Sequence, residues 1–414
     1  MRRNNGINNI EEAEASVSLR SRQVVSDGTE TRKVDQETED PPLVRQIGII
    51  NCLIRFDGIF SPTDFTDFTT DMIGFLLTFL KICAFMTALI FVVVVVIIPL
   101  LLYFCPQCMQ QLFFLNFRRM PLTDYENVSS NGVRAMARSF KLRGDQGKIG
   151  VWHMLPSKLS MRYRENGLRP SDEEIEETMS KEQHSIVLYA HGNSFDRTIS
   201  HRCELYNVLS DMDYHVVAFD YRGYGDSDGN PSEAGLVNDT RVVFDYVKQK
   251  AGNNSLVVWG HSMGTGVSTK LVSDLSQEGS PPAGLILESP FNNLHDVISH
   301  HPFSLPLRWM PDSMFQEIVI NPLYSIGLHM DLDKWIANIT CPILMLHAAD
   351  DHVIPVKLAR LLKERALALE KNVEYVEFDV KREFRHKFIY KADELPALVM
   401  NFMHKCAVLK GQSS

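Results

Sequence analysis

The pattern of apolar and polar positions begins with a long polar segment. Residues 1–70 are polar and charged without a sustained apolar period, and residues 11–40 are rich in Glu, Ser, Thr and Asp. Such a segment buries too little apolar surface to offset the conformational entropy lost on folding, so we predict a disordered tail over residues 1–70. Because the first apolar run comes far from the start, we expect no signal peptide there.

A long apolar run follows this tail. No charged residue occurs in residues 82–104, and residues 91–102 are almost entirely Val, Ile and Leu. A helix needs about 20 apolar residues to cross a bilayer core. A buried helix of a soluble domain is rarely apolar on every face for that length. The sequence therefore predicts one transmembrane segment over residues 71–104, in which Lys81 can snorkel to the interface.

From about residue 150 onward, short apolar runs alternate with amphipathic stretches. These stretches include residues 233–248 and 357–369. The apolar runs are residues 186–190, 215–219, 256–259, 285–287, 343–346 and 373–378. Strands that alternate with helices predict βαβ units and a doubly wound, mostly parallel sheet. We therefore predict an α/β domain over residues 150–410, joined to the apolar segment by a linker over residues 105–149.

Residues 291–338 interrupt this alternation. They contain Pro302, Pro306, Pro311 and Pro322, with aromatic residues and methionines between them. Because proline disrupts the interiors of strands and of long helices, this composition predicts a short helical insertion. We expect the insertion to lie over the C-terminal edge of the sheet as a lid.

A candidate nucleophile lies directly after the apolar run 256–259. The sequence there is Gly-His-Ser-Met-Gly over residues 260–264, followed by a stretch compatible with a helix. This is the G-x-S-x-G nucleophile elbow of the α/β-hydrolase fold, in which Ser262 occupies a sharp strand-to-helix turn and the glycines avoid a clash. The alternative is a buried serine in a Rossmann-type turn. Such a turn places its glycines after the first strand, and Met263 would crowd a pyrophosphate there.

A serine nucleophile of this fold needs an acid and then a base further along the chain. We favour Asp351 as the acid, because it lies four residues after His347 and four before Pro355; Asp350 is its rival. A carboxylate at a strand end can orient and charge-stabilise an imidazole.

Three histidines follow the acid. His386 falls in the polar loop before the last helix, where the base belongs. His352 adjoins the acid, so we do not expect its side chain to reach back to Ser262, and His404 lies in the last amphipathic helix as a surface or packing residue. We therefore predict His386 as the base.

Two backbone N–H groups are needed to hold an oxyanion. We expect one from Met263, directly after the nucleophile, and the other from Asn193, in the turn after the strand 186–190. His191 and Asp196 also fit an H-x-x-x-x-D acyltransferase pattern. We discount that pattern because His191 already belongs to the oxyanion turn.

Composition narrows the remaining function classes. The formal net charge of −9 argues against a nucleic-acid binder, because phosphate neutralisation needs a basic face. The seven cysteines are scattered and do not form a disulfide framework. We interpret Cys105 and Cys108, at the membrane edge, as small hydrophobic residues, with palmitoylation as the alternative; a zinc site would need more ligands. No metal or cofactor is implied.

Several segments together closely resemble the family of α/β-hydrolase domain-containing protein twelve. They are residues 189–193 (YAHGN), 219–227 (FDYRGYGDS), 259–266 (WGHSMGTG), 287–291 (LESPF) and 385–390 (RHKFIY). The resemblance covers roughly residues 150–405. It carries the family's catalytic serine, aspartate and histidine over to Ser262, Asp351 and His386. Met263 stands where related proteins often have Leu, which leaves the backbone donor intact.

The resemblance implies a membrane-anchored serine hydrolase that cleaves lysophosphatidylserine and monoacylglycerols. A membrane anchor favours lipid esters as substrates. Two alternatives stay open: an acyl-protein thioesterase with a cytosolic catalytic domain, and an inactive scaffold on a hydrolase fold. For an anionic headgroup we consider Arg197 and Arg222 as contacts, although Arg222 can instead brace its own turn. The lid's apolar residues are expected either to line an acyl tunnel or to form the lid's own core; they are Phe303, Leu305, Leu307, Trp309, Met310, Met314 and Phe315.

The resemblance also implies a catalytic domain in the lumen of the endoplasmic reticulum. The charges are equivocal, because Arg118 and Arg119 follow the apolar segment and only Lys81 precedes it closely, a distribution that leans slightly the other way. Four N-x-S/T sequons favour a lumenal glycoprotein weakly. They begin at Asn127, Asn238, Asn253 and Asn338.

Overall fold

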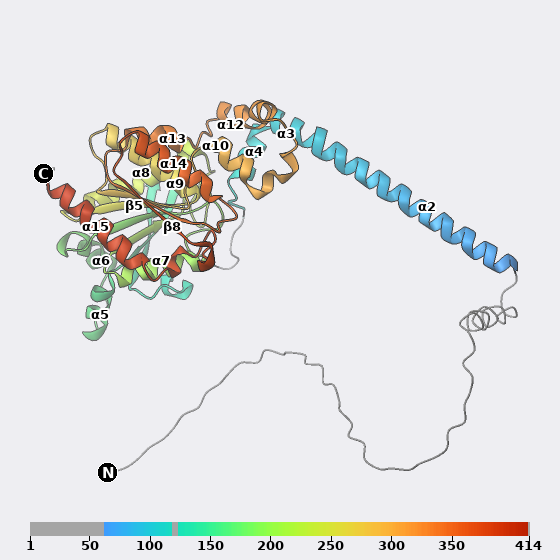
Figure 1. Cartoon of the computed structure of the whole chain (residues 1–414). Helices are drawn as coiled ribbons and strands as arrows, with labels where there is room; N and C mark the ends of the chain where they lie inside the picture. The colour runs from blue at the N-terminus through green and yellow to red at the C-terminus, as the bar shows by residue number, and fades with distance from the viewer. Residues whose placement is uncertain (1–61, 118–122, 413–414) are drawn as a thin grey trace, which may run out of the picture. The chain divides into compact units, whose positions relative to one another are not determined.

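A computed structural model of the chain describes residues 62–117 and 123–412 (Figure 1). The tail predicted over residues 1–70 lies outside the described residues as far as residue 61, and so do Arg118 and Arg119. Helix α2 begins at Pro62, so residues 62–70 are helical rather than part of a tail.

The apolar segment forms one long helix. It consists of α2 (Pro62–Val92), the π-helical turn η1 (Val93–Ile97) and α3 (Ile98–Phe104). The stretch Asp67–Phe104 spans 38 residues and is, within the described part of the chain, the one helix long and apolar enough to cross a membrane. Large apolar side chains such as Phe75 and Phe85 are exposed along it, which suits a helix surrounded by lipid. A short helix, α4 (Pro106–Phe113), follows.

The region after the apolar helix is built on an eight-stranded sheet with the order β1-β2-β4-β3-β5-β6-β7-β8. The first two strand pairs in that order are antiparallel and the other five are parallel. The strands are β1 (Ala137–Gly144), β2 (Gly147–Met154), β3 (Ile186–Ala190), β4 (His215–Phe219), β5 (Leu256–His261), β6 (Gly284–Glu288), β7 (Ile343–Ala348) and β8 (Val373–Phe378). The predicted α/β-hydrolase fold with a mostly parallel sheet is therefore confirmed.

Helices cover both faces of this sheet (Figure 1). One face packs against α8 (Glu233–Lys250), α9 (Met263–Gln277) and α14 (Val356–Ala368), and the other against α7 (Ser200–Asp211) and α15 (Leu395–Gln412). The remaining short elements before the lid and around the last strand are η2 (Val128–Asn131), α5 (Ser157–Glu165), α6 (Asp172–Lys181), η6 (Val380–Arg382) and η7 (Ile389–Lys391). Burial on both faces explains why the strands read as continuous apolar runs.

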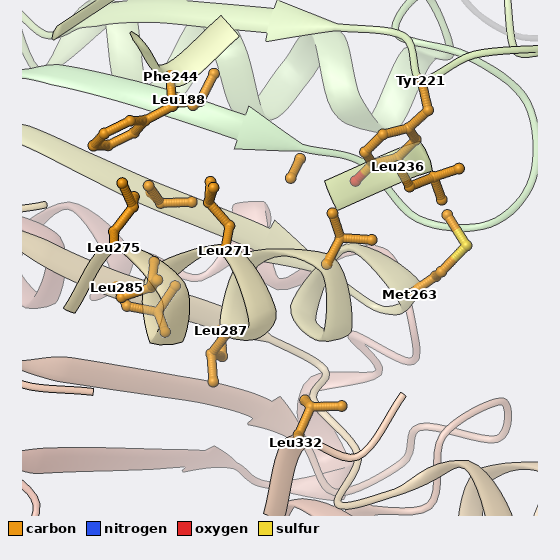
Figure 2. Packing of buried hydrophobic residues seen from close by; sticks show 14 of the residues in the cluster. Leu188, Tyr221, Leu236, Phe244, Met263, Leu271, Leu275, Leu285, Leu287 and Leu332 are labelled. Carbon is orange, nitrogen blue, oxygen red and sulfur yellow. The ribbon is translucent and has the colours of Figure 1, made fainter. Parts of the chain in front are cut away.

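Alternate residues of β5 show how its sequence serves both faces. Leu256 and Val258 belong to the cluster under α8 and α9, whereas Val257 and Trp259 belong to the cluster under α7 and α15. Successive strand side chains point to opposite faces. Figure 2 shows the first cluster, in which leucines of the strands meet leucines of α9, and Met263, at the start of α9, lies on the same side of the view as Leu236 and Tyr221.

The parallel register places the ends of several strands at one edge. Ala190 of β3 is paired with Gly260 of β5, and His261 is paired with Glu288 of β6. The turns that follow β3, β5 and β7 therefore lie close together at the C-terminal edge of the sheet. Open α/β sheets carry their sites at this edge.

The segment after β6 forms a small helical subdomain. Its elements are α10 (Leu294–His300), η3 (Pro302–Leu307), α11 (Asp312–Phe315), η4 (Gln316–Ile320), α12 (Asn321–Ser325), α13 (Leu332–Trp335) and η5 (Ile336–Asn338). Met310, Phe315 and Ile320 pack with Leu102 of α3 in a separate apolar cluster. The lid is thus attached to the last turns of the apolar helix, a contact that the sequence pattern does not reveal.

Candidate functional site

Ser262 occupies a strained turn between β5 and α9. Its φ of 55° and ψ of −122° lie outside the regions that non-glycine residues normally adopt. The backbone N–H of Ser262 donates to the carbonyl oxygen of Glu288 at 2.9 Å, which holds the turn against β6. The side chain is 7% exposed and faces a cavity of about 300 Å³.

Two glycines permit this turn for a steric reason. A β-carbon on Gly260 would lie 2.4 Å from the carbonyl oxygen of Gly264. A β-carbon on Gly264 would lie 2.1 Å from the carbonyl oxygen of Ala190. Both distances are far below van der Waals contact, so the G-x-S-x-G spacing follows from the packing of the elbow against β3.

His386 and Asp351 complete a hydrogen-bonded chain with Ser262. The Nε2 atom of His386 lies 2.9 Å from Ser262 Oγ, and its Nδ1 atom lies 2.7 Å from Asp351 Oδ2. All three side chains are buried. The structure therefore brings together the three residues that the sequence singled out, although 124 positions separate Ser262 from His386.

The carboxylate of Asp351 is held by its own turn after β7. Its Oδ1 atom accepts from the backbone N–H groups of Val353 and Ile354, both at 2.9 Å. Burial alone would raise its pKa, but His386 and His347 outweigh burial and hold the pKa of Asp351 well below its usual range. Asp351 is therefore ionised and rigidly oriented toward the imidazole.

The competing residues lie elsewhere. Asp350 accepts from the backbone N–H of Arg385 at 2.9 Å, so it braces the loop that carries His386. His352 lines the cavity with an exposed side chain, but the hydrogen-bond partner of Ser262 Oγ is His386, and His404 is exposed on α15. The geometry thus distinguishes Asp351, which contacts His386, from Asp350, which does not. Sequence spacing alone could only favour Asp351 over its neighbour.

The turn after β3 approaches Ser262 closely. A β-carbon on Gly192 would lie 3.2 Å from Ser262 Cβ, so glycine allows the approach. Asn193 and Met263 both line the cavity that contains Ser262. Met263 is the first residue of α9, where backbone N–H groups lack helical acceptors. The amide side chain of Asn193 is occupied, because it donates to the carbonyl of Phe113 and accepts from Leu115 N at 3.1 Å.

Arg202 fixes the turn after β3, and sequence reasoning missed it. Its guanidinium is buried and donates to the carbonyl oxygens of Gly192 at 3.1 Å and Ser194 at 2.8 Å, and also to that of Asp196. No carboxylate of the described residues forms an ion pair with it in the structure. A planar guanidinium that donates to three carbonyl oxygens of one turn fixes the backbone of that turn. The backbone N–H groups of the turn are held in place as a result. Its position on α7 gives no signal in a single sequence.

His261 links the Ser262 turn to the loop that carries His386. Its Nε2 atom lies 2.9 Å from the carbonyl oxygen of His386, so this nitrogen carries the proton and donates. Burial and the adjacent His386 keep the pKa of His261 well below its usual range. A neutral imidazole therefore ties the His386 loop to the elbow.

Arg197 and Arg222, the predicted headgroup contacts, do not line this cavity. Arg197 is fully buried, is paired with Asp220 and Asp226, and packs over the Tyr125 ring at 4.8 Å. Arg222 donates to Asp239 at 2.6 Å and to the exposed Asp145, as expected of a residue that braces its own turn. The structure brings neither arginine to Ser262.

His191 and Asp196 do not form a catalytic pair either. His191 Nε2 lies 3.3 Å from Asp220, and burial lowers the pKa of His191. Asp196 instead accepts from Tyr125 Oη at 2.7 Å and from Thr198. These contacts are those of a structural network behind the turn after β3, in which His191 and Asp196 have separate partners.

Cys105 and Cys108 form a disulfide, so the interpretation of these residues as small hydrophobes was wrong. The bridge lies where α3 ends and α4 begins. Over residues 62–117 and 123–412, no group of three or more His, Cys, Asp or Glu side chains is placed to hold a metal ion.

Comparisons with known proteins agree with this geometry. The family model described as "Serine aminopeptidase, S33" matches residues 181–331. The lysophosphatidylserine lipase ABHD12 of Mus musculus is 40% identical over 313 residues, which cover 74% of this chain and 77% of that protein. ABHD12 of Danio rerio is 38% identical over a match that covers 74% of this chain and 80% of that protein. Protein ABHD12B of Homo sapiens is 31% identical over a match that covers 71% of this chain and 80% of that protein.

Solved structures share the fold. An α/β-hydrolase from Vibrio vulnificus superposes with a TM-score of 0.50 at 20% identity and covers 69% of this chain and 88% of that chain. An esterase from Pyrococcus furiosus gives a TM-score of 0.49 at 16% identity, and the match covers 70% of this chain and 96% of that chain. The first of these likenesses supports the α/β-hydrolase architecture.

Asp351→Asn should reduce kcat far more than Asp350→Asn. The asparagine amide at position 351 would favour the wrong tautomer of His386, a change that lowers the rate by about 10⁴-fold in a protease with this arrangement. Asparagine at position 350 can still accept from Arg385 N. The measurement is the hydrolysis rate of a soluble ester by each purified variant. Equal rates for the two variants would show that the acid has been wrongly assigned.

Glu288 should make stability depend on pH. Burial raises its pKa to about 7, and Trp259 Nε1 donates to it at 3.0 Å. Because the folded-state pKa exceeds the ordinary value of 4.5, the stabilisation present at low pH is lost as pH rises through about 7. Relative to wild type, the free energy of unfolding of Glu288→Gln should rise by about 2.5 kcal/mol between about pH 5 and about pH 8. Denaturant unfolding at both pH values measures this, and parallel pH profiles would refute the assignment.

Proposed function

We propose, since the chain belongs to the ABHD12 family of serine hydrolases, that it hydrolyses the acyl ester of lysophosphatidylserine through an acyl-enzyme on Ser262. The observation that carries the proposal is the hydrogen-bonded chain from Ser262 through His386 to Asp351. The lipases that are 38–40% identical to it over 74% of its length supply the substrate class. Neither a thioesterase nor an inactive scaffold is favoured by these relatives or by an intact triad.

The proposed reaction begins with proton transfer within the triad. His386 Nε2 takes the proton from Ser262 Oγ as that oxygen attacks the ester carbonyl. The same nitrogen then gives the proton to the departing glycerol oxygen. Water, deprotonated by His386, releases the fatty acid and restores the serine. Asp351 stabilises the imidazolium throughout, and its low pKa supports that role.

The backbone N–H groups of Met263 and Asn193 are proposed to hold the oxyanion. The start of α9 supports the first assignment, because the helix dipole and the unpaired N–H groups favour negative charge there. The close approach of Gly192 to Ser262 supports the second. Arg202 helps by fixing the turn and by placing a buried positive charge behind it.

Monoacylglycerols are proposed as further substrates. They share a single acyl chain and a glycerol leaving group with lysophosphatidylserine, so the same chemistry applies. The cavity around Ser262, of about 300 Å³, and the apolar cavity of about 270 Å³ under the lid support a single-chain lipid ester over a two-chain phospholipid, because spaces this small favour one hydrocarbon chain over two.

The catalytic domain is proposed to lie in the lumen of the endoplasmic reticulum, behind a single membrane span. The Cys105–Cys108 disulfide directly after the apolar helix supports an oxidising compartment. The four sequon asparagines, Asn127, Asn238, Asn253 and Asn338, are all exposed, as glycan attachment requires. A thioesterase acting on cytosolic proteins would need the opposite orientation.

Ser262→Ala should abolish hydrolysis of lysophosphatidylserine and labelling by a fluorophosphonate probe. His386→Ala should lower kcat by a comparable factor, about 10⁴ or more, because triad members act as a unit. The assay uses the full-length protein in nanodiscs with lysophosphatidylserine, two-chain phosphatidylserine and monoacylglycerol. Retained labelling of Ser262→Ala would overturn the nucleophile, whereas equal turnover of the one-chain and two-chain lipids would overturn the substrate class alone.

Glycosidase treatment of the protein expressed in cells should increase its gel mobility. In sealed microsomes, added protease should spare the C-terminal domain, because a lumenal domain is shielded by the membrane. The matched control replaces all four sequon asparagines by glutamine, which should remove the mobility change. Digestion of the domain in intact vesicles would contradict the lumenal orientation.

A further inference from the structure

A second cavity of about 270 Å³ adjoins the one that contains Ser262. Six residues line both cavities, so the two spaces meet at a shared wall. They are Phe113, Leu115, Asn193, Val297, His301 and Phe303. The second cavity leads away from the nucleophile, between α4 and the lid elements α10 and η3.

The chemistry of the second cavity suits a hydrocarbon chain. Three of its lining residues, Asn193, His301 and Ser304, have polar side chains, and each is engaged internally. Asn193 accepts from Leu115 N, His301 Nδ1 accepts from Phe303 N at 3.2 Å, and Ser304 Oγ donates to the carbonyl of Ile298. The rest of the lining is apolar, so the cavity favours an apolar occupant.

The far wall belongs to the apolar helix itself. Ile98 and Leu102 of α3 line the second cavity but not the cavity around Ser262. Leu102 also packs against Leu307 and Phe315 of the lid. The end of the candidate membrane helix therefore forms one side of the space, in addition to connecting the domain to the bilayer.

The rim of the cavity is apolar and open. Leu112 of α4 is 62% exposed and Phe303 of η3 is 65% exposed, and both line the cavity. Leu305 and Trp309, next to Phe303 in the lid, are exposed as well. Exposed apolar side chains on either side of an apolar opening, beside the end of a membrane helix, indicate an opening that faces lipid.

We infer that the second cavity is the acyl-chain site, with the end of the membrane helix as its far wall, and that the lipid's chain reaches Ser262 from the bilayer between α4 and η3. This inference rests on the proposed ester hydrolysis and adds where the chain is held. It assigns Ile98 and Leu102 a role in chain-length selection, which a plain anchor would not have. Met310 and Phe315 belong instead to the lid's own core.

The test fills the far end of the cavity. Ile98→Trp places a larger side chain at the far wall, whereas the matched control Leu101→Trp places the same bulk on a residue of α3 that is exposed and does not line the cavity. Full-length proteins in nanodiscs are assayed with p-nitrophenyl esters from octanoyl to stearoyl, and separately with the corresponding lysophosphatidylserines. Fluorophosphonate labelling reports whether each variant folds with an intact nucleophile.

Ile98→Trp should lower the stearoyl-to-octanoyl ratio of kcat/KM by about tenfold or more, since a displaced chain loses the burial of several methylenes. Leu101→Trp should keep the wild-type ratio, and the smaller change Ile98→Phe should shift it in the same direction by less. Equal ratios for the two tryptophan variants would overturn the acyl site. If wild type cleaves the p-nitrophenyl esters but no lysophosphatidylserine, the proposed substrate fails while the chain-length result still decides this inference.

Discussion

The close packing of the Ser262 turn against β3 is the constraint on which the rest of the site depends. Gly264 meets the carbonyl of Ala190 with no room for a β-carbon, and Ser262 is held at a positive φ by its hydrogen bond to β6. This packing exists because β3, β5 and β6 are parallel neighbours in register. The same edge then receives Asp351 from β7 and His386 from the loop after β8, so that a strained serine meets its base and acid.

The sequence predicted the parts of this arrangement that depend on local patterns. The short apolar runs predicted the buried strands, and the long apolar run predicted the helix. The G-x-S-x-G motif indicated Ser262, because a sharp strand-to-helix turn has no room for side chains at the two glycine positions. Asp351 was chosen over Asp350 by spacing. The structure separates them physically, since one carboxylate faces His386 and the other faces the N–H of Arg385.

Features that depend on side-chain contacts between loops and helices could not be predicted. Arg202 of α7 donates to carbonyl oxygens of the turn after β3, and His261 donates to the carbonyl oxygen of a residue 125 positions away. Arg197 looked like a free cation in the sequence, yet Asp220 and Asp226 neutralise it in the interior. The packing of Leu102 on the lid also follows from tertiary structure, and it connects the candidate membrane helix to the lid that lines the cavity of Ser262. The Cys105–Cys108 bridge is a local contact, but the spacing of the two cysteines alone did not indicate that they are oxidised.

The central claim is that Ser262 is the nucleophile of a lipid ester hydrolase. The most direct measurement is to label the full-length protein in membranes with a fluorophosphonate, digest it, and locate the adduct by tandem mass spectrometry. The account predicts one modified site, Ser262, whose labelling is blocked by lysophosphatidylserine. An adduct on another serine of the same edge, such as Ser194 or Ser289, with Ser262 unmodified, would contradict it.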